Sequence, residues 1–246
     1  MRVKFDVVSD VGCVRTNNED MALAFGQQIR DGEMSLDFEA PAGSRMTAIV
    51  ADGMGGYDKG EVASEMATQS FNLFLQQLPE GLQEDDVKNE VKRWVEHINR
   101  EIVIAAQGSG MGCTFTGLFT YGEWAFLINI GDSRTYRLRY DLFKQLTTDH
   151  SERNRLDDPS LPSNLIYNAL GIQDVFADIS SIKLVDGDIY LVCSDGLTDM
   201  VDVETIESIL NTENHVGARV LVEAAKHAGG EDNVTVLLFS VSHVAE

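Results

Sequence analysis

Two pairs of amphipathic helices interrupt runs of short apolar strands, and this order constrains the fold more than any other feature of the sequence. Apolar residues at helical spacing predict one helix pair over 60–78 and 85–107, and a second over 203–210 and 215–228. Helices that arrive in pairs between runs of strands indicate an α+β fold, because a parallel sheet would need a regular β-α-β alternation. We predict strands at 3–9, 21–25, 47–51, 113–120, 124–130, 135–140, 188–193 and 234–241, and a hairpin arm over 27–38 centred on Asp31-Gly32.

Each helix of the first pair carries a single apolar stripe. A stripe of this width predicts that the helix buries one face in the core, and it needs no cofactor to explain it. The stripe residues are Val62, Met66, Phe71, Phe74 and Leu78 in the first helix, and Val87, Val91, Val95, Ile98 and Ile102 in the second.

The charge balance excludes two classes of partner. The 246 residues include 40 Asp and Glu against 19 Lys and Arg, for a formal net charge of −21. Nucleic acids and anionic membrane surfaces bind clustered Lys and Arg, so we expect neither as a partner. No apolar stretch approaches the length of a membrane span, and the first ten residues alternate like a strand and not like a signal peptide. Three cysteines without metal-type spacing fit free thiols, so we expect a cytoplasmic protein. We also expect a monomer with one domain over 1–246, because no linker divides the chain.

Three carboxylates stand at the ends of predicted core strands. Asp52 and Asp195 each follow an apolar run and precede a glycine, whereas Asp232 comes just ahead of the last strand. Each one alone is also explained as a turn or a helix cap, since Asp-Gly is a common turn signal. Carboxylates that gather at the ends of core strands repel one another unless a cation lies between them. If the fold brings the three together, they predict a site for a divalent metal ion.

Two arginines and a histidine each allow more than one interpretation. Arg15, in a loop between predicted strands, could hold a phosphate group or form a surface ion pair with its acidic neighbours. Asp132 and Arg134 could likewise form an ion pair at a strand end. His150 stands between an aspartate and a serine, but adjacent residues of an extended chain point to opposite faces, so these three cannot form a catalytic relay. We therefore expect a structural role for His150.

The residues at these positions, in this order, resemble the metal-dependent serine/threonine protein phosphatases of the type 2C (PPM) class in their compact bacterial form. The resemblance runs from Ser9 to about Val241, and it implies a sandwich of two antiparallel β-sheets flanked by antiparallel helix pairs, a four-layer αββα arrangement. The segments that carry it are Arg15-Thr16-Asn17-Asn18-Glu19-Asp20, Asp52-Gly53-Met54-Gly55-Gly56, Gly131-Asp132-Ser133-Arg134, Asp149-His150-Ser151, Ser194-Asp195-Gly196 and Glu231-Asp232-Asn233.

The resemblance implies a binuclear metal centre with particular ligands. Asp52 bridges two metal ions, and the main-chain carbonyl of Gly53 binds one of them. Asp195 and Asp232 hold the other ion. Asp132 matches the position that helps to bind a third metal in bacterial members. The implied cofactors are two Mn²⁺ or Mg²⁺ ions per chain, with the third as a further site.

The resemblance also implies a reaction and its partners. Arg15 grips the substrate phosphate, while Glu19, Asp20 and Asn233 act at or just behind the metal ligands. A hydroxide that bridges two metal ions attacks phosphoserine or phosphothreonine in a protein, with no phospho-enzyme intermediate. The implied partners are phosphorylated proteins and a bacterial Ser/Thr kinase whose action the chain opposes.

One departure from the family pattern bears on substrate choice. Only residues 151–170, which we call the flap, separate His150 from Gly171, and family members usually hold a longer segment there. Met54 stands where animal relatives carry a histidine, so no general acid is assigned. Two other interpretations stay open: a protein that binds phosphoproteins without turnover, and a phosphohydrolase for non-protein esters.

Overall fold

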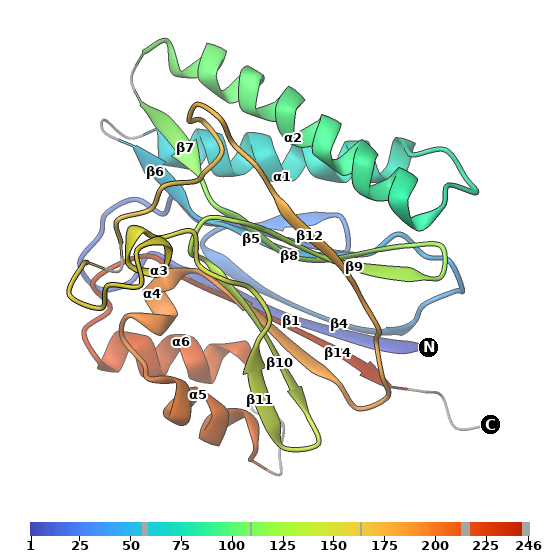
Figure 1. The fold of residues 1–246 in the computed structure, drawn as a ribbon. Helices are drawn as coiled ribbons and strands as arrows, with labels where there is room; N and C mark the ends of the chain where they lie inside the picture. Colours follow the sequence, from blue (N-terminus) through green and yellow to red (C-terminus); the bar gives the residue numbers. More distant parts are fainter. Residues whose placement is uncertain (56–58, 109, 163, 213–216, 243–246) are drawn as a thin grey trace.

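A computed structural model describes residues 1–55, 59–108, 110–162, 164–212 and 217–242. Two six-stranded antiparallel sheets lie face to face, and a helix pair covers the outer face of each, which confirms the α+β four-layer arrangement (Figure 1). Sheet A has the order β11 (Leu142–Gln145), β10 (Arg134–Arg139), β13 (Ile189–Cys193), β14 (Val234–Ser242), β1 (Arg2–Asp10) and β4 (Gly32–Glu39). Sheet B has the order β12 (Asp178–Ile182), β9 (Trp124–Ile130), β8 (Phe115–Tyr121), β5 (Thr47–Ala51), β2 (Met21–Ala24) and β3 (Gln27–Ile29).

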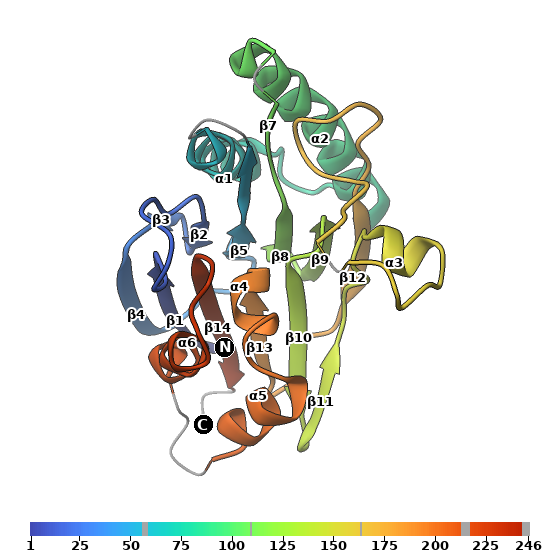
Figure 2. The ribbon, with the colours of Figure 1, turned by 90° about the vertical axis from the view of Figure 1, so that its left-hand side faces the viewer.

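The helix pairs occupy the two outer layers, as Figures 1 and 2 show. On sheet B lie α1 (Gly60–Gln77) and α2 (Glu84–Ala106), and on sheet A lie α5 (Val203–Leu210) and α6 (Ala218–His227). The predicted start of α6, residues 215 and 216, falls outside the described residues. Sequence analysis did not predict the single-turn helices α3 (Glu152–Arg155) and α4 (Asp195–Thr198), or the short ladder of β6 (Gly53–Gly55) and β7 (Met111–Cys113).

The alternation of β1 shows why the sheets stack. Val3, Phe5 and Val7 are buried in the layer between the sheets. Phe5 lies opposite Phe239 of β14, with the two ring centroids 4.9 Å apart. The even-numbered residues of the strand point to the outer face of sheet A, as a period of two requires. This apolar layer joins the two sheets into one core.

The helix stripes differ in how well the sequence predicted them. In α1, Phe71 is buried as predicted, but Val62 is 40% exposed. The buried face of α1 instead includes Ala63 and Ala67, whose small side chains let the helix lie close to sheet B. The stripe of α2 is confirmed throughout, since it buries Val87, Val91, Val95, Ile98 and Ile102.

The hairpin arm predicted over 27–38 is wrong. Strand β3 pairs with β2 in sheet B, whereas β4 pairs with β1 in sheet A, so Asp31-Gly32 carries the chain from one sheet to the other. The hairpin turn lies earlier, at Phe25-Gly26, where φ is 45° and 78°. Phenylalanine is not a typical turn residue, so Gly26 was the one turn signal at this point, and Asp31-Gly32 gave a stronger one.

None of the helices within the described residues is long and apolar enough to cross a membrane.

Candidate metal centre

The predicted carboxylates come from both sheets and meet at one end of the sandwich. Asp52 and Asp132 follow β5 and β9, and Asp20 precedes β2, so these three belong to sheet B. Asp195 follows β13 and Asp232 precedes β14, so these two belong to sheet A. In Figure 1 this end is on the left, where α4 begins and β6 ends. The strand ends that carry the five carboxylates therefore lie at the same end of the sandwich.

The electrostatics of Asp52 show how close the carboxylates are. Burial is the largest influence, and the negative charges of Asp20, Asp195, Asp132 and Asp232 follow it, so the pKa of Asp52 lies well above its ordinary value. Burial also raises the pKa of Asp195, and a hydrogen bond with the Asp52 side chain lowers it in part. A cluster of this kind holds fewer than its full number of negative charges unless a cation neutralises it.

Asp52 joins two strands and does not form a hairpin turn, which settles one alternative. Its N–H donates to Thr114 Oγ1 at 2.9 Å, and its carbonyl accepts from the Thr114 N–H at 2.9 Å. The N–H of Gly53 donates to the Glu19 carbonyl at 3.1 Å. A Cβ at residue 53 would lie 2.3 Å from the carbonyl oxygen of Gly60, so only glycine fits. The chain therefore runs extended past Asp52, from β5 into β6.

Asp195 opens the single-turn helix α4. Its pKa is raised to about 6, first by burial and then by the charge of Asp199, four residues further on. The following Gly196 packs against strand β14, since a Cβ there would lie 1.9 Å from the carbonyl oxygen of Asn233. This close contact joins the start of α4 to the segment that carries Asp232.

Asp20 is the most deeply buried of the five carboxylates. Its Oδ2 accepts a hydrogen bond from Ser194 Oγ at 2.7 Å, while Oδ1 has no partner among the described residues. Burial raises the pKa of Asp20 to about 7 despite hydrogen bonds from Ser194 and Thr235. A buried carboxylate oxygen without a partner is costly, and such an atom marks a place where a cation or its bound water fits.

Glu19 and Asn233 hold the loop that carries Arg15. Asn233 Oδ1 accepts from the Glu19 N–H at 2.8 Å, and its Nδ2 donates to the carbonyls of Val11 at 3.1 Å and Asn17 at 2.9 Å. Glu19 Oε1 accepts from the backbone N–H at residue 60, at the start of α1, at 3.2 Å. Both side chains therefore hold the backbone of the loop in place.

Arg15 lies at the edge of the carboxylate cluster. Its Nη2 is 2.7 Å from Asp232 Oδ2, and the two side chains are 50% and 42% exposed. The ion pair predicted as an alternative for Arg15 thus exists, but its partner is one of the predicted metal ligands and not a neighbour in the loop. The guanidinium remains open to solvent beside the cluster.

The ion pair suggested between Asp132 and Arg134 is wrong. Arg134 instead binds Asp149, with Nη2 2.7 Å from Oδ2 and Nε 3.1 and 3.0 Å from Oδ1 and Oδ2. Asp132 is buried, and its pKa is raised to about 7, first by burial and then by the charge of Asp195. A cation bound beside Asp132 would favour the ionised form of this carboxylate.

Asp199 and Asn164 were not predicted as site residues. Both line a small cavity together with Asp132, Arg134, Asp149 and Asp195. The N–H of Asp199 donates to the Asp195 carbonyl at 2.8 Å, so α4 places both carboxylates on one face. An Asp-x-x-x-Asp spacing at the start of a helix was the available signal. Asn164 lies within the polar flap, where no pattern singled it out.

The donor set fits a hard divalent cation, because it consists of carboxylates and the Gly53 carbonyl. Across the residues that the structure describes, no three His, Cys, Asp or Glu side chains converge closely enough to enclose an ion by themselves. Backbone and water oxygens, and movement of side chains such as Arg15, would therefore be needed to complete the coordination.

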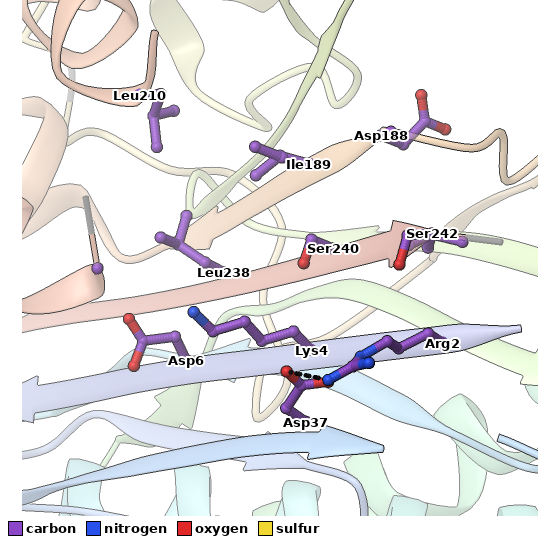
Figure 3. Close-up of a pocket in the computed structure, with 13 residues that line it drawn as sticks. Arg2, Lys4, Asp6, Asp37, Asp188, Ile189, Leu210, Leu238, Ser240 and Ser242 are labelled. Carbon is purple, nitrogen blue, oxygen red and sulfur yellow. Dashed lines mark hydrogen bonds and ion pairs between the residues drawn. The ribbon is translucent and has the colours of Figure 1, made fainter. Parts of the chain in front are cut away.

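A separate cavity of about 280 Å³ lies at the opposite end of the strands (Figure 3). Arg2, Lys4 and Asp6 from the start of β1 line it, with Leu238 and Ser240 of β14. None of the predicted site residues belongs to it. The carboxylate cluster thus remains the candidate site.

Without metal ions, the protein is expected to lose stability as the pH rises from about 4 to about 7. The pKa values of Asp20 and Asp132 are about 7 and that of Asp195 is about 6, all above the unfolded value of about 4. Raised carboxylate pKa values favour folding below pH 4, and this contribution is lost as the pH rises through 6 and 7. In EDTA, we expect the melting temperature to fall by about 5 °C across this range. Saturating Mn²⁺ should reduce the fall, and a melting temperature that rises with pH in EDTA would contradict the assignment.

Comparison with known proteins points to one family. The Protein phosphatase 2C family matches residues 28–219. The chain is 32% identical to "Serine/threonine phosphatase stp" of Listeria innocua, over 94% of this chain and 92% of that protein. The structure of the serine/threonine phosphatase of S. agalactiae is similar, with a TM-score of 0.83 and 28% identity over 98% of this chain and all of that one. The catalytic domain of the phosphatase PstP in complex with two manganese ions is similar too, with a TM-score of 0.78 and 32% identity over 99% of this chain and all of that one.

Proposed function

The chain belongs to the protein phosphatase 2C family and is a protein serine/threonine phosphatase, and we propose that it acts through a binuclear metal centre between its two sheets. The observation that carries the proposal is that Asp52 is buried and lies close to four other carboxylates, which together with burial raise its pKa well above the ordinary value. In the proposed assignment, Asp52 and the Gly53 carbonyl would hold one ion, and Asp52, Asp195 and Asp232 would hold the other. The PstP structure in complex with two manganese ions supports this count.

When bound, the two cations would supply the hydroxide that attacks phosphorus and would neutralise charge on the phosphate oxygens. The chain's own residues do the rest. Arg15 releases Asp232 and binds two phosphate oxygens through its planar guanidinium. Asn233 and Glu19 keep the Arg15 loop in place. Asp20 accepts a hydrogen bond from Ser194 and lies behind the residues that would bind the ions.

A third cation is proposed in the small cavity beside Asp132. Asp132, Asp195 and Asp199 would supply its carboxylates, and Asn164 an amide oxygen. The Arg134–Asp149 pair lies against the same cavity and balances part of the charge there.

The proposed substrates are phosphorylated proteins, which a Ser/Thr kinase must supply, because only phosphoryl transfer to a hydroxyl makes these esters. We further propose Mn²⁺ or Mg²⁺ as the ion, the cytoplasm as the location, a monomer, and one catalytic domain over residues 1–246 with a shortened flap. The net charge of −21 disfavours nucleic acid as a substrate.

The test is hydrolysis of a phosphothreonine peptide and of p-nitrophenyl phosphate, each with Mn²⁺ and with EDTA. We expect turnover of both with Mn²⁺ and of neither with EDTA. Turnover of the small ester alone would favour a non-protein phosphohydrolase. No turnover of either substrate with metal would favour a protein that only binds phosphoproteins.

Arg15→Ala is expected to raise KM for the phosphothreonine peptide by about tenfold or more, because hydrogen bonds to charged groups contribute about 1.5–3 kcal/mol. The kcat should change little, since generation of the hydroxide does not depend on the guanidinium. The matched control is Arg2→Ala, which removes an exposed arginine paired with Asp37 at the other end of the sandwich. Steady-state kinetics of both variants decide the matter, and an unchanged KM in Arg15→Ala would refute the phosphate-binding role.

A further inference from the structure

His150 lies where three segments meet, and it binds all of them. Both backbone polar groups of Gly131 contact it: the Gly131 N–H donates to His150 Nδ1 at 3.1 Å, and the Gly131 carbonyl accepts from the His150 N–H at 2.9 Å. In the flap, Asn168 Nδ2 is 2.7 Å from His150 Nδ1, and the Tyr167 N–H donates to the His150 carbonyl at 2.9 Å. From β12, Asp178 Oδ2 lies 3.0 Å from His150 Nε2.

These contacts determine which ring nitrogen carries the proton. Asn168 Oδ1 accepts from the Phe176 N–H at 3.2 Å, and its Nδ2 donates to the Phe176 carbonyl at 2.9 Å, so the amide orientation is set by the backbone. The Nδ2 group and the Gly131 N–H both donate to Nδ1, which must therefore be an acceptor. The proton is then on Nε2, where it is donated to Asp178.

The imidazole has little freedom to take another position. His150 and Asn168 are 2% and 1% exposed. The His150 ring packs against Phe176 and Tyr167, with centroid distances of 4.9 and 5.7 Å. Gly131 is equally constrained: its φ is +103°, and a Cβ there would lie 2.6 Å from the side chain of Thr114. The buried His150 side chain is thus hydrogen-bonded to a turn whose backbone conformation is itself constrained.

The turn that His150 grips leads directly to a site residue. Gly131 shares a peptide bond with Asp132, which is buried and lies within electrostatic reach of Asp195. On its other side His150 binds the flap, whose Asn164 lines the same cavity as Asp132. One side chain therefore connects the position of the flap with the position of Asp132.

We propose that His150 is a positioning residue, which holds the Gly131–Asp132 turn against the flap and so sets where Asp132 meets a cation. The catalytic consequence rests on the proposed function, but the effect on the turn does not. Nδ1 acts on the turn and the flap, whereas the bond from Nε2 to Asp178 keeps the ring in the orientation that Nδ1 requires.

Two substitutions separate the two nitrogens. In His150→Asn, the side-chain oxygen takes the place of Nδ1, so the acceptor for Gly131 and Asn168 is kept. In His150→Gln, the side-chain nitrogen reaches the place of Nε2, so the contact with Asp178 is kept and the acceptor is lost. The two variants have the same polarity and differ in one methylene, and melting temperatures in EDTA report their folding.

The first readout is amide hydrogen exchange of residues 127–134 in metal-free protein. We expect His150→Gln to exchange about tenfold faster than wild type at Gly131, since one backbone hydrogen bond is lost, and His150→Asn to stay close to wild type. The second readout is Mn²⁺ binding by calorimetry. The weakest site should lose about tenfold in affinity in the Gln variant and recover in the Asn variant, as supporting residues of metal sites do.

Equal behaviour of the two variants overturns the proposal, whether both match wild type or both are impaired, because the role of Nδ1 is then absent. If His150→Gln fails to fold, Asp178→Ala replaces it. That variant changes a side chain that is 61% exposed and should speed exchange at Gly131 less strongly. No change there would also overturn the proposal. If the wild-type protein showed no phosphatase activity, the proposed function would be refuted, but the hydrogen-exchange result would still test the role of His150.

Discussion

Asp195→Asn is expected to lower kcat for a phosphothreonine peptide by about 10³-fold, because a cation that loses a charged ligand loses several kcal/mol of transition-state stabilisation. The same variant should be at least as stable as wild type in EDTA at pH 8. Asp195 has a raised pKa from burial and from Asp199, so its charge is unfavourable when no cation balances it. Lost activity with retained or increased stability is a combination that a damaged fold cannot produce.

The matched control for this change is Asp141→Asn. It removes the same charge from an exposed turn residue whose φ is 61°, a conformation that asparagine adopts readily. Steady-state kinetics with Mn²⁺ and melting curves in EDTA are measured for both variants. Near-normal turnover by Asp195→Asn would refute its place in the metal centre.

Asp188→Ala is expected to destabilise the protein by about 3 kcal/mol, because it leaves the charge of Arg139 without its buried partner. Asp188 is fully buried and accepts from Arg139 Nε at 2.6 Å, Arg139 Nη2 at 2.7 Å, Tyr190 Oη at 2.8 Å and the Val185 N–H at 2.9 Å. Burial acts to raise the pKa of Asp188, but these hydrogen bonds outweigh it and the pKa is lowered. The stabilisation is therefore present above the unfolded pKa and is lost as the pH falls through the folded one.

Urea denaturation measures this effect, with the same transition followed by circular dichroism and fluorescence. Asp37→Ala is the control, since it breaks the Arg2–Asp37 pair, whose side chains are 56% and 44% exposed. Exposed pairs of this kind contribute little, so no measurable change is expected there. If the two variants unfolded at the same urea concentration, the hydrogen-bond network of Asp188 would not be a main source of stability.

Much of the fold was predictable because long, strongly periodic segments dominate the chain. The stripe of α2 and the alternation of β1 each identify an element and its buried face without knowledge of its neighbours. The elements that were missed lack such a period. Strand β12 lies at the edge of sheet B and is half exposed, and α3 and α4 are single turns of four residues, too short to show an apolar period.

The candidate site was predictable in part, and the reason is again physical. Asp52, Asp195 and Asp232 stand next to apolar runs, so their placement at strand ends could be inferred from the sequence. Their meeting could not, because it depends on how two sheets stack. Ion-pair partners could not be predicted either, because they depend on side-chain geometry. Arg15 pairs with Asp232, and Arg134 pairs with Asp149 and not with Asp132.

The origin of the carboxylates in two different sheets has a consequence for how the protein can be tuned. Stacked sheets lie about 10 Å apart, at a distance that the interleaved side chains determine. Phe5 and Phe239, which pack between the sheets away from the carboxylate cluster, therefore help to set the distance between the two halves of the candidate metal centre. Evolution or design can widen or narrow the gap between ligands by exchanging such apolar residues, without touching a single charged group.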